Sequence, residues 1–79
     1  MSTIKENIAN NIAELRKMNH MTQQDLAEKL NYTDKAISKW ERGESTPDVE
    51  SLSAIAKMFN LTVFLICQLV KFTNNNFTA

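Results

Sequence analysis

The sequence predicts an all-α protein, a compact bundle of five helices. A single glycine and a single proline in 79 residues are too few for the many tight turns of a β architecture. Hydrophobic residues recur at steps of three and four, which puts them on one face of a helix. Since a chain of this length can form only one modest core, we expect a single domain.

The first two helices are expected at residues 3–18 and 22–30. The first has its apolar face on Ile4, Ile8, Ile12 and Leu15. Thr22 is placed to cap the second, because its hydroxyl accepts a hydrogen bond from an unpaired first-turn amide, and Asp25 is a shortened capping-box partner. Asn31 is expected to end this helix, since asparagine tolerates the left-handed conformation found at such an end.

A third helix is predicted at residues 33–42, with Thr33 as its N-cap and Gly43 as the glycine that ends it. Its core face is Ala36, Ile37 and Trp40. Only the three residues 31–33 separate it from the second helix, which is the spacing of a helix-turn-helix. Hairpins of helices are common, so this spacing alone does not identify a function.

The fourth helix is expected to begin at Thr46-Pro47-Asp48. In this interpretation Thr46 is the N-cap, Pro47 lies in the first turn, and Asp48 faces the positive end of the helix dipole. Its apolar stripe is Val49, Leu52, Ile55, Ala56 and Phe59. A fifth, strongly apolar helix is expected at residues 63–72. Residues 73–79 have no periodicity, so we expect a flexible C-terminal tail there.

Charge and composition exclude several classes of protein. Nine basic and nine acidic residues cancel, so any case for a nucleic-acid partner depends on where the charges lie. The single cysteine, Cys67, permits no internal disulfide and indicates a reducing, cytoplasmic setting. The N-terminus lacks the pattern of a signal peptide, and the longest apolar run, residues 63–67, is too short to span a bilayer.

No constellation of residues for catalysis is present in the sequence. His20 has no second histidine and no matching cysteine with which to hold a metal ion. One glycine cannot build a phosphate-binding loop. We therefore expect no enzyme activity, no cofactor, no metal and no small-molecule ligand.

Residues 22–43, TQQDLAEKLNYTDKAISKWERG, resemble the Xre- or Cro-type helix-turn-helix family of phage-repressor-like proteins. The resemblance extends over about residues 5–66. It implies a lambda-repressor-like DNA-binding domain at residues 1–72, whose recognition helix, 33–42, lies in the major groove. It also implies a cytoplasmic, nucleoid-associated transcription regulator, usually a repressor, that binds a (pseudo)palindromic operator of double-stranded DNA as a homodimer.

The face of the recognition helix turned away from the core supplies the candidate DNA contacts. Lys35 and Lys39 are four residues apart, so both ammonium groups can enter one groove and donate to guanine or phosphate, or else simply lie on a solvated face. Asp34 either accepts from cytosine or only complements the helix dipole. By resemblance, Gln23 matches a residue that binds phosphate. The complete predicted set is Gln23, Tyr32, Thr33, Asp34, Lys35, Ser38, Lys39 and Arg42.

The resemblance also assigns residues to the scaffold. It implies that Arg16, near the end of the first helix, pairs with Glu41 at the close of the third, because a guanidinium fork matches a carboxylate. The fifth helix is too apolar to bury every side of itself, so we expect it either to meet a second copy or to pack over the core. The residues predicted for the dimer contact are Phe64, Leu65, Leu69 and Phe72.

One alternative function stays open at this point. A protein-interaction module with the same fold, such as an antitoxin that binds a partner toxin through its apolar C-terminal end, has the same sequence features. Loss of operator binding in lysine variants of the third helix distinguishes the two functions.

Overall fold

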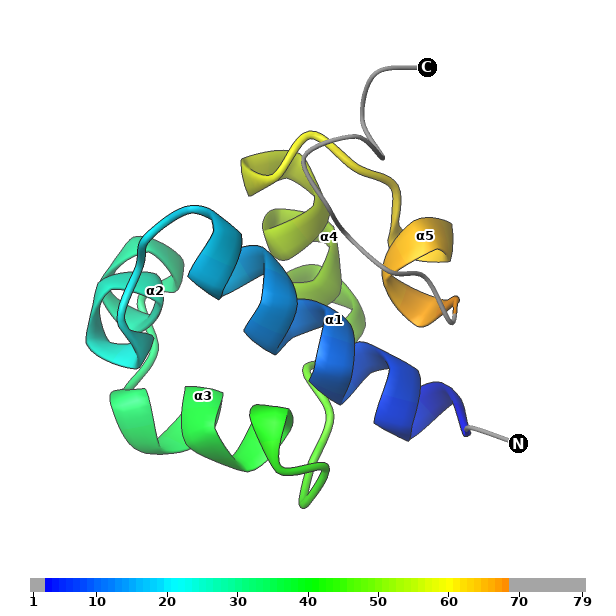
Figure 1. Ribbon diagram of the computed structural model, residues 1–79, viewed down its shortest axis with the longest axis horizontal. Helices are drawn as coiled ribbons and strands as arrows, with labels where there is room; N and C mark the ends of the chain where they lie inside the picture. The colour runs from blue at the N-terminus through cyan, green and yellow to red at the C-terminus, as the bar shows by residue number, and fades with distance from the viewer. Residues whose placement is uncertain (1–2, 69–79) are drawn as a thin grey trace.

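The computed structural model describes residues 3–68, and this part of the chain is all-helical, as predicted (Figure 1). The five helices are α1 (Ile4–Met18), α2 (Gln23–Leu30), α3 (Asp34–Glu41), α4 (Val49–Met58) and α5 (Val63–Cys67). Figure 1 shows α1 crossing the centre of the molecule, with α2 and α3 on one side of it and α4 and α5 on the other. None of these helices combines the length and apolar character that crossing a membrane requires.

Each helix begins at a residue whose side-chain oxygen accepts a hydrogen bond from a first-turn amide. The five N-caps are Thr3, Thr22, Thr33, Asp48 and Thr62. At Thr22 the capping box is complete, because Asp25 also accepts from the backbone amide of Thr22 at 2.9 Å. The predicted N-caps of α2 and α3 are therefore confirmed.

The predicted start of α4 at Thr46 is wrong by two residues. Asp48 is the N-cap, and its carboxylate accepts from the amide of Ser51 at 2.8 Å. Pro47 precedes the helix and is buried. Both threonine and aspartate are good N-caps, so local preference alone does not choose between them.

Four helices are followed by a residue in the left-handed conformation, which turns the chain back toward the bundle. These residues are His20, Asn31, Gly43 and Asn60, with φ of 57°, 62°, 73° and 60°. Asn31 and Gly43 hold the positions predicted for them. Asparagine and glycine adopt this conformation readily, whereas histidine does so less easily.

All five helices contribute to one hydrophobic core. Its buried members are Ile8, Ile12, Leu26, Ala27, Ile37, Trp40, Leu52, Ile55, Ala56 and Ile66. Two residues expected on apolar faces, Ile4 and Val49, are exposed instead, Val49 by 76%. Both begin their helices, and side chains there lean past the end of the helix, where no neighbouring element covers them.

Helix α5 is shorter than predicted, because it ends at Cys67 and Gln68 is extended. Two buried asparagines of α1 hold this end. The Asn11 amide donates to the carbonyls of Ile66 and Gln68, both at 2.7 Å, and Asn7 donates to the carbonyl of Cys67 at 3.1 Å. These carbonyls would otherwise lack partners at a helix C-terminus. The predicted contacts of Leu69 and Phe72 and the predicted tail at 73–79 lie outside the described residues.

Candidate nucleic-acid interface

Helices α2 and α3 form a helix-turn-helix that is attached to the core through its turn. The turn at residues 31–33 is fixed by the backbone amide of Tyr32, which donates to the carbonyl of Ala27 at 2.8 Å. Ala27 is fully buried, so the turn is fastened to the core. Thr33 then starts α3 by accepting from the amide of Ala36 at 3.2 Å. In Figure 1, α3 runs along one edge of the molecule, with α1 on its inner side.

The two faces of α3 differ in burial. Ile37 is fully buried and Trp40 nearly so, whereas Asp34, Lys35 and Lys39 are exposed. Within residues 3–68, neither lysine forms an ion pair with a carboxylate. Both ammonium groups therefore stand on the outer side of α3, where an anionic partner can approach them.

Glu41, at the end of α3, joins three elements of the fold. Arg16 of α1 donates to its carboxylate through Nε at 2.7 Å and through Nη2 at 3.0 Å. Gln23 of α2 donates to the same carboxylate at 3.0 Å. The hydrogen bonds to Glu41 raise the pKa of Arg16, so its guanidinium stays charged although it is largely buried. The structure thus brings together the predicted pair, and the pair fixes the end of α3 to the scaffold.

Three predicted DNA contacts have partners inside the protein. Gln23 is the donor to Glu41 just described, and the Thr33 hydroxyl is the N-cap of α3. The Tyr32 ring packs edge-on against Trp40 with 5.1 Å between centroids, and its hydroxyl accepts from Ser51 of α4 at 2.6 Å. Tyr32 therefore ties the turn to α4, which sequence reasoning did not anticipate.

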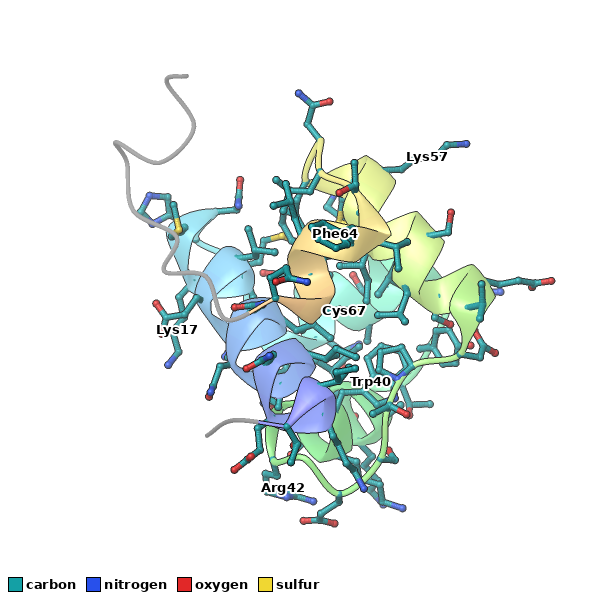
Figure 2. The ribbon with its side chains drawn as sticks, turned by 90° about the vertical axis from the view of Figure 1, so that its right-hand side faces the viewer. Lys17, Trp40, Arg42, Lys57, Phe64 and Cys67 are labelled. Atoms are coloured by element: carbon teal, nitrogen blue, oxygen red, sulfur yellow. The ribbon has the colours of Figure 1, made fainter. Side chains whose placement is uncertain are left out.

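Arg42 and Ser38, also predicted as contacts, lie together at the end of α3. The Arg42 guanidinium donates to the Ser38 hydroxyl and to the carboxylate of Glu44. Figure 2 shows Arg42 at the lower edge of the molecule. The sequence analysis did not predict the pairing of Glu44 with Arg42. A signal for it was present, because a glycine that turns the chain separates the arginine from an acidic residue.

The predicted dimer surface is described only in part. Phe64 is 69% exposed on α5, while Leu65 and Cys67 are half-buried. In Figure 2, Phe64 and Cys67 face the viewer, well above Arg42. The apolar surface of α5 and the end of α3 are therefore separate parts of the molecular surface.

Among the described residues, no group of three or more histidine, cysteine or acidic residues is arranged to hold a metal ion.

Residues 12–66 match the family model described as Helix-turn-helix. Among curated proteins, the chain is similar to the HTH-type transcriptional activator BcrR of Enterococcus faecalis, at 44% identity over 52 residues, 66% of this chain and 26% of that protein. It is also similar to the type II methyltransferase M.SsoII of Shigella sonnei, at 43% identity over 53 residues, 63% of this chain and 14% of that protein. The chain thus spans about a quarter or less of the length of these relatives.

Solved structures have the same arrangement of helices. The clp gene regulator ClgR from Corynebacterium glutamicum superposes with a TM-score of 0.73 at 20% identity, over 82% of this chain and 69% of that one. A transcriptional regulator from Listeria innocua superposes with a TM-score of 0.72 at 28% identity, over 86% of this chain and 64% of that one. The range that matches the family model contains both halves of the Arg16–Glu41 pair and all of α2, α3 and α4.

Proposed function

This chain belongs to the Xre-type helix-turn-helix family of DNA-binding transcription regulators, and we propose that it represses transcription as a homodimer bound to a (pseudo)palindromic operator. One observation carries the proposal. Helix α3 buries Ile37 and Trp40 while it exposes Lys35 and Lys39 on the opposite side. A helix held in this way can enter the major groove without losing its packing.

The proposed contacts fall into two groups. Lys35 and Lys39 reach base edges together with Asp34 and Ser38, where lysine donates to guanine and aspartate accepts from cytosine. The remaining contacts, from Gln23, Thr33 and Arg42, are with phosphate and position the helix in the groove. Tyr32 is proposed to meet phosphate as well, because its side chain is exposed and its hydroxyl, which accepts from Ser51, still has a proton to donate.

The balance of charge limits how strongly one domain binds. Nine basic residues are offset by nine acidic ones over the whole chain, so the attraction to DNA comes from the local placement of Lys35, Lys39 and Arg42. We therefore expect modest affinity for a single domain and a strong dependence on salt concentration.

A dimer is proposed through α5. Phe64 is the large apolar side chain that α5 leaves exposed in the described part of the chain, and Leu65 lies next to it. A two-fold dimer places two copies of α3 about 34 Å apart, one turn of the DNA helix. Sedimentation equilibrium should show that Phe64→Ser shifts the protein toward monomer. Val49→Ser, at an exposed valine of α4, is the matched control.

DNA binding itself is tested with the purified chain and a fluorescent mixed-sequence duplex of about 30 base pairs, roughly three helical turns. Binding should weaken steeply as salt is raised. Lys35→Ala and Lys39→Ala should each weaken it further, because either lysine can donate to phosphate where no guanine faces it. Lys57→Ala should not, because Lys57 lies on α4 at the end of the molecule opposite Arg42 (Figure 2). Absence of salt-sensitive binding to any duplex rejects the proposal and favours a protein-interaction module.

The operator and the sign of regulation need separate measurements. Selection of bound sites from a random duplex library should return an inverted repeat with half-sites one helical turn apart. Transcription from a promoter that contains the selected site should fall when the protein is added, because occupation of the promoter alone is sufficient for repression. A rise in transcription would instead make the protein an activator, which is how the relative BcrR is described. The proposed place of action is the cytoplasm, where the DNA lies.

A further inference from the structure

The end of the recognition helix carries an ion pair that the proposed DNA contacts do not explain. Arg42 is the C-cap residue of α3, and Gly43 follows it in the left-handed conformation at φ 73°. This turn brings Glu44 back onto α3, where its amide donates to the carbonyl of Lys39 at 2.9 Å. The Glu44 carboxylate then accepts from Nε of Arg42, while Nη1 of Arg42 donates to the hydroxyl of Ser38.

We propose that Glu44 competes with DNA phosphate for Arg42 and thereby weakens sequence-independent binding. The inference rests on the proposed function, because it concerns the same face of α3. It makes Glu44 a residue that lowers the affinity for DNA through Arg42 and without touching DNA.

The chemistry of the pair supports competition. A carboxylate oxygen and a phosphate oxygen are both anionic acceptors that match the donors of a guanidinium. The hydrogen bond from Arg42, aided by the positive charges of Arg42 and Lys39, holds the pKa of Glu44 below its ordinary value. Glu44 is therefore ionised at neutral pH and occupies donors of Arg42 that a phosphate would otherwise take.

The Arg42–Glu44 pair is too exposed to contribute much to the stability of the fold. The side chains of Arg42 and Glu44 are 56% and 53% exposed, and ion pairs of this kind contribute little to folding because water screens them. The Arg16–Glu41 pair, by contrast, is buried and fastens α3 to the scaffold. Competition with phosphate for Arg42 gives this charge pair a role that its small contribution to folding does not.

The size of the effect depends on the source of the binding free energy in each kind of complex. Sequence-independent binding is almost entirely attraction to phosphate with release of counterions. It therefore loses one of its few sources of binding free energy when Glu44 occupies Arg42. Binding to an operator also uses base contacts, here assigned to Lys35 and Lys39, which Glu44 does not occupy. Because Arg42 meets phosphate in both kinds of complex, the competition lowers the affinity for operator and for random DNA by the same factor, and it takes a larger share of the weaker, sequence-independent binding.

The test is a double-mutant cycle read out by affinity for the mixed-sequence duplex over a range of salt concentrations. The variants are wild type, Glu44→Gln, Arg42→Ala and the double variant, with Glu14→Gln as the control that removes the same charge from an exposed position of α1. Glu44→Gln should bind several-fold more tightly than Glu14→Gln. Its plot of log affinity against log salt should be steeper by about 0.9, the slope of one added phosphate contact. In the Arg42→Ala background the substitution of Glu44 should have no effect beyond that of Glu14→Gln.

The remaining outcomes are distinguishable from each other. If wild type binds DNA but Glu44→Gln matches Glu14→Gln or binds more weakly, the competition is absent and this inference fails while the proposed function stands. If the gain persists in the Arg42→Ala background, Glu44 acts as a general charge and the inference fails as well. If wild type binds no duplex, the proposed function fails and the inference fails with it. Circular dichroism should show unchanged folding, since both residues are exposed.

Discussion

Arg16 and Glu41 are 25 residues apart in the chain and form a bidentate ion pair, with Nε 2.7 Å from Oε2 and Nη2 3.0 Å from Oε1. Their side chains are only 13% and 8% exposed, which separates this pair from an ordinary surface pair. Arg16 also donates to the carbonyl of Met21 at 2.9 Å. The pair thus links the end of α1, the start of α2 and the end of α3, and it sets the position of α3 relative to the core.

Removal of the Glu41 carboxylate should therefore destabilise the fold. Glu41→Ala leaves the Arg16 charge buried without its partner and removes the acceptor of Gln23, so we expect the free energy of unfolding to fall by about 3 kcal/mol. Urea unfolding followed by circular dichroism measures this change. Glu14→Ala, an exposed glutamate on α1, should change stability by less than about 0.5 kcal/mol. Equal losses in the two variants would show that the pair does not clamp α3.

A second prediction concerns the asparagine that holds α5. Asn11 is buried and donates to two carbonyls at the end of α5. Asn11→Ala leaves these carbonyls without a hydrogen-bond donor and creates a small cavity. We therefore expect the free energy of unfolding to fall by about 2 kcal/mol. Asn10→Ala, at the adjacent exposed asparagine, provides a control of identical chemistry and should have little effect. A small loss at Asn11 would mean that α5 is held by its apolar contacts alone.

The left-handed residue after α1 offers a route to greater stability. His20 adopts φ 57°, a conformation that costs a residue with a side chain roughly 1 kcal/mol and costs glycine almost nothing. His20→Gly should therefore raise the free energy of unfolding by roughly 0.5 kcal/mol after the added flexibility of the unfolded chain is counted. Asn31→Gly should gain less, because asparagine already tolerates this conformation. A loss of stability in the His20 variant during thermal unfolding would indicate that its side chain makes a contact that outweighs the strain.

Features of the fold that depend on neighbouring residues were predictable from sequence. Threonine caps and left-handed asparagine or glycine are chosen by interactions within a few residues, so α2 and α3 were placed correctly from Thr22, Asn31, Thr33 and Gly43. The start of α4 was misplaced because Thr46 and Asp48 can both act as N-cap, and in the structure Asp48 takes this role.

Features that depend on distant residues were not predictable in this way. Helix α5 ends where it does because Asn7 and Asn11 meet its carbonyls from 60 and 55 residues away, and apolar periodicity contains no sign of them. The candidate site shows the same limit. Spacing predicted that Lys35 and Lys39 share a face, but the hydrogen bond from Ser51 to Tyr32 depends on how α4 packs against the turn.

The helix caps predict how stability depends on acid. Three carboxylates, those of Glu6, Asp25 and Asp48, accept hydrogen bonds from backbone amides at helix starts, and these bonds lower the pKa of each below its ordinary value of 4.5 for glutamate and 3.8 for aspartate. As the pH falls, the unfolded chain binds protons at these groups before the folded chain does. The stabilisation is therefore complete above the ordinary values and is lost as the pH drops through the lowered ones, between about pH 5 and pH 2.

Asp48→Asn isolates one of these contributions. An asparagine side chain still accepts from the amide of Ser51, so the cap survives, but it has no proton to bind in this range. We expect the variant to have nearly the stability of wild type at neutral pH and a shallower loss of stability toward pH 2, because the unfolded variant no longer binds an extra proton there. Unfolding free energies measured by urea titration at a series of pH values provide the test. If the two curves run parallel between pH 5 and pH 2, proton uptake at Asp48 is the same in the folded and unfolded chains, and its hydrogen bond to α4 does not contribute to acid sensitivity.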